Sequence, residues 1–70
     1  MEIPKELLEK WKALRVHGDP KEIIALMPAE QRVSEQTIRV AFNEGQCSEP
    51  VFLAMAEFYK KRAETIAQYL

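Results

Sequence analysis

Residues 33–45 read VSEQTIRVAFNEG, and this stretch carries the start and stop signals of one short helix. Ser34 stands where an N-cap residue is expected, and Val33 before it is placed to pack on Ile38 as a hydrophobic staple. Gly45 closes the stretch, at a position where helices often end in a left-handed residue. The apolar residues between these signals recur at helical spacing, which predicts a buried face made of Ile38, Ala41 and Phe42.

Two further helices are predicted before this stretch. The first begins near Pro4 and ends at Gly18, because proline suits a first helical turn and glycine suits a helix end. Asp19 is then the expected N-cap of a second helix, which Pro28 stops. Residues 29–32 form a polar connection with room for one tight helical turn. The apolar stripes of the two helices are Leu7, Leu8, Trp11 and Leu14, and Ile23, Ile24 and Met27.

A long last helix is predicted over residues of about 49–70, with Ser48 as its N-cap. Its stripe runs toward the C-terminus through Val51, Phe52, Met55, Phe58, Tyr59, Arg62, Ile66 and Tyr69. No segment alternates apolar and polar residues over a strand's length, so no sheet is expected. We therefore expect a single compact all-α domain over residues 1–70 with four helices, or five if the turn at 29–32 is counted.

Composition excludes several classes of protein. The chain has 70 residues, with 10 Lys and Arg against 11 Asp and Glu and a net charge of −1. Its single cysteine, Cys47, allows no internal disulfide, and no Cys/His cluster has the spacing of a zinc site. No apolar run approaches the length of a membrane span, and the N-terminus lacks a signal-peptide pattern. We therefore expect a cytoplasmic protein with no membrane association.

The sequence carries no catalytic signature. We find no carboxylate pair, no nucleophile with a neighbouring base, no glycine-rich phosphate loop and no metal-ligand spacing. The expectation is therefore a protein that is not an enzyme and that uses no cofactor, metal or small-molecule ligand.

The helix at about 34–44 meets the demands of a DNA recognition helix. Such a helix needs an apolar edge to anchor it and small or polar residues at its start that reach base edges and phosphates. Gln36 has the amide that pairs with adenine, and Arg39 has the guanidinium that reads guanine or holds a phosphate. The hydroxyls of Ser34 and Thr37 are suited to phosphate or base contacts.

Several short motifs follow one another in a particular order. In chain order they are Lys21, Ala25, Val33-Ser34-x-x-Thr37-Ile38, Phe42-Asn43-x-Gly45 and Ser48-x-x-Val51-Phe52-x-x-Met55-Ala56. In this order and spacing, from Ile23 to about Tyr59, the chain resembles a phage-repressor-type helix-turn-helix domain of the Cro-like and lambda-repressor-like kind.

The resemblance implies a sequence-specific protein that binds double-stranded DNA as a homodimer and regulates transcription in a phage or bacterium. The helix-turn-helix would span residues of about 20–44. By the resemblance, the base-reading residues would be Ser34, Glu35, Gln36, Thr37, Arg39 and Val40. By the same resemblance, the phosphate contacts would be Lys21 and Asn43. We expect Arg32 as a further phosphate contact.

A second interpretation is a helical protein–protein interaction module that has this fold without binding DNA. The weak charge balance and the long apolar C-terminal tail favour it. The turn at 28–33 also departs from the family, because it is longer than usual and contains no glycine. Glu35 repels phosphate unless it accepts a hydrogen bond from a cytosine amino group. The two interpretations differ in which charges dominate the face around Gln36, the basic Lys21, Arg32 and Arg39 or the acidic Glu35 and Glu44.

The last helix is longer than the core of so short a chain can cover. We expect its C-terminal end to meet another surface, and a symmetric second copy is the simplest source of one. The alternative is a frayed tail that packs on nothing. The residues expected at the dimer interface are Phe58, Tyr59, Ile66, Tyr69 and Leu70.

Overall fold

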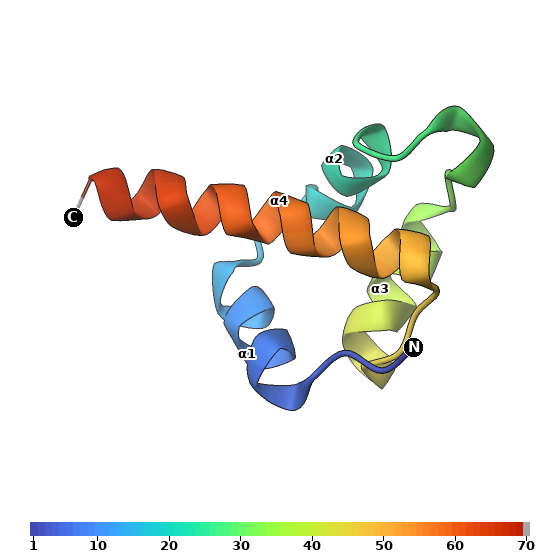
Figure 1. The fold of residues 1–70 in the computed structure, drawn as a ribbon, viewed down its shortest axis with the longest axis horizontal. Coiled ribbons are helices and arrows are strands. Elements are labelled where there is room, and N and C mark those ends of the chain that lie inside the picture. The colour runs from blue at the N-terminus through green and yellow to red at the C-terminus, as the bar shows by residue number, and fades with distance from the viewer. Residues whose placement is uncertain (70) are drawn as a thin grey trace.

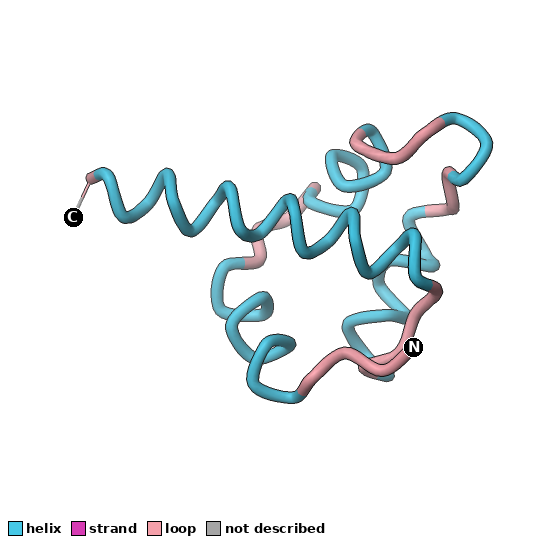
Figure 2. The backbone as a smooth tube through the Cα atoms, viewed as in Figure 1, coloured by secondary structure: helices cyan, strands magenta, loops and turns pink. Residues whose placement is uncertain are grey.

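Four α-helices and one short 3-10 turn make up the computed structural model, which describes residues 1–69 (Figure 1). In chain order they are α1 (Lys5–Leu14), α2 (Asp19–Ala25), η1 (Ala29–Gln31), α3 (Glu35–Glu44) and α4 (Glu49–Gln68). Short loops join them, as Figure 2 shows. The prediction of an all-α domain with four helices is confirmed, and the tight turn expected at 29–32 is present as η1.

Local signals set both ends of α3, as predicted. The Ser34 hydroxyl accepts a hydrogen bond from the backbone N–H of Thr37 at 3.3 Å. Gly45 follows the helix with a φ of 70°, a left-handed conformation that favours glycine, and its N–H donates to the Ala41 carbonyl at 2.9 Å. Ser48 stands at the same position before α4 but makes no side-chain cap hydrogen bond.

The connection between α1 and α2 differs from the prediction. α1 ends at Leu14, and Gly18, with a φ of 95°, precedes α2 instead of closing α1. Asp19 is the first residue of α2 rather than its N-cap, and its buried carboxylate accepts from the Val16 N–H at 2.8 Å. The physical reason is tertiary, because α4 offers this carboxylate stronger partners than the orphan N–H groups of a helix start.

The core lies where α4 crosses the other helices (Figure 1). Trp11 of α1 is buried, as expected, and its ring stacks on Tyr59 of α4 with centroids 5.8 Å apart. Phe42 of α3 meets the same Tyr59 ring edge-on at 5.9 Å. Tyr59 therefore joins α1 and α3 to α4. The buried apolar side chains are Ile3, Trp11, Ile23, Met27, Ile38, Ala41, Phe42, Val51, Ala54, Met55 and Tyr59.

The N-terminal residues pair with the loop between α3 and α4. The N–H of Ile3 donates to the Gly45 carbonyl at 2.8 Å, and the N–H of Cys47 donates to the Met1 carbonyl at 3.0 Å. This isolated antiparallel bridge is the strand-like pairing seen among residues 1–69. It buries Ile3 and holds the C-terminal end of α3 in place.

The C-terminal end of α4 extends beyond the other helices (Figure 1). Tyr59 is buried, whereas Ile66 is 41% exposed and Tyr69, just after the helix, is 85% exposed. The last turns of α4 are therefore uncovered in the single chain.

Candidate nucleic-acid interface

α3 has one buried face and one exposed face. The buried face consists of the residues that the apolar periodicity predicted. Ile38, Ala41 and Phe42 are at most 1% exposed and fix the helix to the core. The predicted base-reading residues lie outside this buried face, with Val40 half-buried and the others exposed: Ser34, Glu35, Gln36, Thr37 and Arg39. The predicted residues other than Val40 are therefore exposed, although Glu35 and Thr37, two positions apart, point to different sides of the helix.

An ion pair within α3 limits the positive charge of this surface. A terminal guanidinium nitrogen of Arg39 lies 3.5 Å from Glu35 Oε1, with about half of each side chain exposed. The two residues are four positions apart, a spacing at which helical side chains meet. Arg39 is therefore partly neutralised, although its exposure leaves it able to reach a second partner.

Ser34 and Thr37 are engaged with each other at the start of α3. Their hydroxyl oxygens are 3.1 Å apart, in addition to the cap hydrogen bond from the Thr37 N–H. These two hydroxyls stabilise the helix start, and each keeps further capacity to donate or accept.

The predicted phosphate-binding residues are exposed and come from three different elements. Lys21 lies in α2, Arg32 follows η1, and Asn43 lies in the last turn of α3. Arg32 donates through Nε to the carbonyl of the buried Met27 at 3.2 Å, which ties the long turn to the end of α2.

A buried polar network, missed by the sequence analysis, positions α2 against α4. Asp19, 1% exposed, accepts from the Tyr59 hydroxyl at 3.1 Å and from Arg62 Nη1 at 2.5 Å. The same nitrogen of Arg62 donates to the Leu14 carbonyl at 3.2 Å. A signal for this network was present, since Arg62 is a charged residue at an apolar-stripe position.

The network shifts the pKa values of Asp19 and Tyr59 in opposite directions. Burial acts to raise the pKa of Asp19, but hydrogen bonds from Arg62, the Val16 N–H and Tyr59 outweigh it and hold that pKa below its usual range. Burial and the adjacent Asp19 carboxylate raise the pKa of Tyr59 well above its ordinary value. Asp19 is therefore ionised and Tyr59 remains a hydrogen-bond donor at neutral pH.

The residues predicted for a dimer interface divide into different environments. Tyr59 is a correction, because it lies in the core and has no free surface to offer a partner. Phe58 is half-buried under the Arg62 guanidinium, whose central carbon is 4.7 Å from the ring centroid. Ile66 and Tyr69 are exposed, and Leu70 lies outside the described residues.

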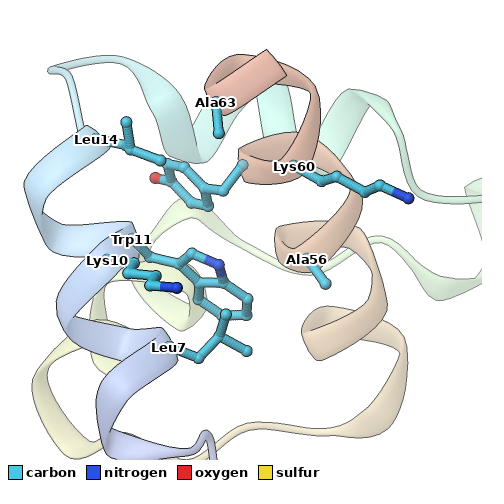
Figure 3. Close-up of a pocket in the computed structure, with 8 residues that line it drawn as sticks. Leu7, Lys10, Trp11, Leu14, Ala56, Lys60 and Ala63 are labelled. Atoms are coloured by element: carbon cyan, nitrogen blue, oxygen red, sulfur yellow. The ribbon is translucent and has the colours of Figure 1, made fainter. Parts of the chain in front are cut away.

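Two apolar grooves flank the C-terminal half of α4. The first, of about 330 Å³, lies between α1 and α4, and Figure 3 shows Trp11 and Leu7 of α1 in it, with Lys60 pointing away. The second, of about 570 Å³, is named here the Leu26 groove. Its lining residues are Leu14, Val16, Leu26, Phe58, Lys61, Arg62, Thr65 and Ile66. Val16 and Leu26 were not singled out from the sequence, because neither belongs to the apolar stripe of its predicted helix.

The charges around Gln36 are mixed. Lys21, Arg32 and Arg39 are exposed as a basic face requires, but Glu35 pairs with Arg39 and Glu44 is exposed at the end of the same helix. Neither sign of charge dominates the exposed face of α3.

No helix within residues 1–69 combines the length and apolar character needed to cross a membrane. Comparison of the chain with protein-family models, curated proteins and solved structures found no match.

Proposed function

We propose that this chain is a small sequence-specific DNA-binding protein that regulates transcription by placing α3 in the major groove. One observation carries the proposal. α3 is anchored by three fully buried side chains and presents an exposed polar row of Gln36, Arg39 and Asn43 on its opposite side. These residues are three and four positions apart, so they follow one line along the helix.

The row has the chemistry of base and phosphate recognition in the order that groove docking requires. Gln36 lies in the first turn, where recognition helices contact base edges, and its amide can donate to and accept from adenine. Arg39, one turn on, has the donor pair that reads guanine. In the proposal, Asn43 in the last turn contacts the phosphates together with Lys21 of α2 and Arg32 after η1.

Glu35 has two effects on the proposed site: it weakens binding to phosphate, and it favours particular bases. It must accept a hydrogen bond from DNA or remain paired with Arg39, because a carboxylate facing phosphate is repelled. A cytosine amino group is the major-groove donor that suits a carboxylate. The proposal therefore places a cytosine beside the base pair that Arg39 contacts.

Two copies acting together belong to the same proposal. A single short helix offers few base contacts, and a two-fold dimer doubles them at half-sites one helical turn apart. The exposed end of α4 is the segment available to join the copies.

The row is tested by binding measurements on selected duplex DNA. The double substitution Gln36→Ala and Arg39→Ala should weaken specific binding by about 2 to 4 kcal/mol, because each side chain makes one bidentate base contact. Lys12→Ala, on the exposed face of α1, removes a cation without touching α3 and should change specific affinity little. Fluorescence anisotropy at several salt concentrations measures both effects. Equal losses in the two proteins would reject α3 as the reading helix.

The Glu35–Arg39 ion pair supplies a second test, in which the substitution should raise DNA affinity instead of lowering it. Glu35→Gln removes one negative charge and releases Arg39, so affinity for mixed-sequence duplex DNA should rise and become more dependent on salt. Glu57→Gln on α4 is the matched control, because it also removes an acid paired with a cation four positions away. A rise with both variants would show only a change in net charge.

The second candidate function is a protein–protein interaction module, which the Leu26 groove and the mixed charges of α3 favour. A titration of isotope-labelled, assigned protein with duplex DNA separates the two candidates. NMR shifts in residues 34–43 that disappear as salt rises support DNA binding. An absence of shifts there, or shifts confined to α4, supports the interaction module.

A further inference from the structure

Three of the exposed large apolar side chains meet in one place. Val16, Leu26 and Ile66 are 57%, 42% and 41% exposed, and all three line the Leu26 groove. They come from the α1–α2 connection, the end of α2 and the last turns of α4. Exposed apolar side chains are normally scattered singly over a surface, so their convergence in one groove gives it the character of a docking site.

We infer that the occupant of the Leu26 groove is the C-terminal end of α4 from a second copy of this chain. The inference deepens the proposed function and rests on it for its role at DNA, because it assigns the surface that joins the two copies. The end of α4 provides both halves of the contact. Thr65 and Ile66 form part of the groove wall, and Tyr69 just beyond them is 85% exposed. A two-fold pairing therefore lets each copy insert its own end and receive the other.

Charge complementarity favours a second copy over an unrelated partner. Glu64 is the only charged residue between positions 63 and 69. The groove wall carries Lys61, which is 66% exposed and reaches Glu57 of its own helix at 3.6 Å, an exposed pair that leaves Lys61 able to contact a second carboxylate. In an antiparallel pair of α4 helices that meet at their Leu26 grooves, with the two-fold axis at the level of position 63, Lys61 lies opposite position 65 of the other copy. Glu64 of that copy is then within one turn of Lys61. Each pairing would form two such contacts.

The position of the groove is compatible with the proposed DNA surface. Figure 1 shows the C-terminal end of α4 on the opposite side of the molecule from α3. A dimer joined at the Leu26 groove therefore leaves the outer face of α3 uncovered in both copies.

Light scattering on the full chain, without DNA, tests the surface. The wild-type mass should rise from 8.1 kDa toward twice that value with concentration. Leu26→Glu and Ile66→Glu should each weaken association by at least about tenfold, because they place an unpaired charge in an apolar contact. Leu53→Glu is the matched control, since Leu53 lies on the same helix, is 58% exposed and does not line the groove. Emission from Trp11, buried in the core, reports whether each variant is folded.

Two results would overturn this assignment of the surface. One is a wild-type chain that stays monomeric at the highest soluble concentration, which would leave the groove to a different partner. The other is association that Leu26→Glu weakens no more than Leu53→Glu does.

A charge exchange tests the antiparallel orientation. Lys61→Glu and Glu64→Lys should each weaken self-association, because each variant places like charges opposite each other twice. An equal mixture of the two should recover association, since both contacts then join opposite charges. A mixture no stronger than its components would reject the antiparallel pairing.

The dimer and the DNA surface fail independently in these experiments. The double substitution at Gln36 and Arg39 should leave self-association unchanged. Loss of DNA binding with an intact dimer would count against the proposed function alone, and a monomeric chain that still binds DNA would count against the groove alone.

Discussion

Asp19 is the side chain on which the placement of α2 against α4 most depends. Its carboxylate, 1% exposed, collects hydrogen bonds from the Val16 N–H, the Tyr59 hydroxyl and the Arg62 guanidinium. A buried carboxylate is tolerated only when it is paired and hydrogen-bonded, and here all of its partners come from the connection before α2 or from α4. Removing one partner would therefore loosen the contact between the two helices.

Asp19→Asn should lower stability by about 3 kcal/mol near neutral pH, because it leaves a partly buried guanidinium without its carboxylate. The folded protein holds the pKa of Asp19 below the unfolded value, so the stabilisation is present above the unfolded pKa and is lost as pH falls through the folded one. The wild-type chain should thus lose stability below about pH 4, and the variant should lose less. Urea unfolding followed by Trp11 fluorescence measures both quantities.

Glu22→Gln is the control for this prediction, because Glu22 also faces Arg62 but is 66% exposed and 3.9 Å away. Its loss should cost less than about 1 kcal/mol. The same pH dependence in both variants would contradict the assignment of the acid-sensitive stability to Asp19.

α3 is the element whose two ends are held by the strongest local signals in the chain. The Ser34 cap opens it, the left-handed Gly45 closes it, and the bridge from Ile3 to the Gly45 carbonyl secures its end. A recognition helix benefits from such fixed ends, because its outer row must keep one register against the groove.

Ser34→Ala should cost about 1 kcal/mol of stability, since it removes the hydroxyl that accepts from the Thr37 N–H. Ser48→Ala is a matched comparison, because Ser48 precedes α4 at the equivalent position without a side-chain cap hydrogen bond and should cost less. Thermal unfolding by circular dichroism compares the two. Equal losses of stability in the two variants would mean that the hydrogen bond from the Thr37 N–H to Ser34 contributes no measurable stability.

α4 organises the whole molecule. Its residues up to Arg62 contact α1, α2 and the Phe42 ring of α3. Its last turns extend past those helices (Figure 1). The part of α4 up to Arg62 therefore contributes to the fold of one chain, and the last turns are available for assembly.

Ending the chain at Thr65 should separate these two roles. The shortened chain keeps Arg62 and its contacts to Asp19, so Trp11 emission should remain that of the folded protein. It loses Ile66 and Tyr69, so light scattering should report a monomer under conditions where the full chain is a dimer. A mass unchanged by the truncation would exclude the end of α4 as the joining segment.

Most of the fold follows from interactions between residues close together in the chain. Caps, turns and 3.6-residue stripes act over a few positions, and this is why the bounds of α3 and its buried and exposed faces agree with the prediction. The Glu35–Arg39 pair was also accessible from the sequence, because its spacing is that of neighbouring turns.

The remaining features depend on contacts between distant parts of the chain. Asp19 is a buried ion-pair partner instead of a cap because Tyr59 and Arg62, more than 39 positions away, approach it only in the folded molecule. Tyr59 and Ile66 belong to one predicted stripe, yet one is buried and the other exposed, because the core covers only the first part of α4. The Leu26 groove likewise joins three segments whose sequence periodicities carry no information about one another. Periodicity specifies which side of a helix is apolar, whereas packing specifies how much of that side is covered.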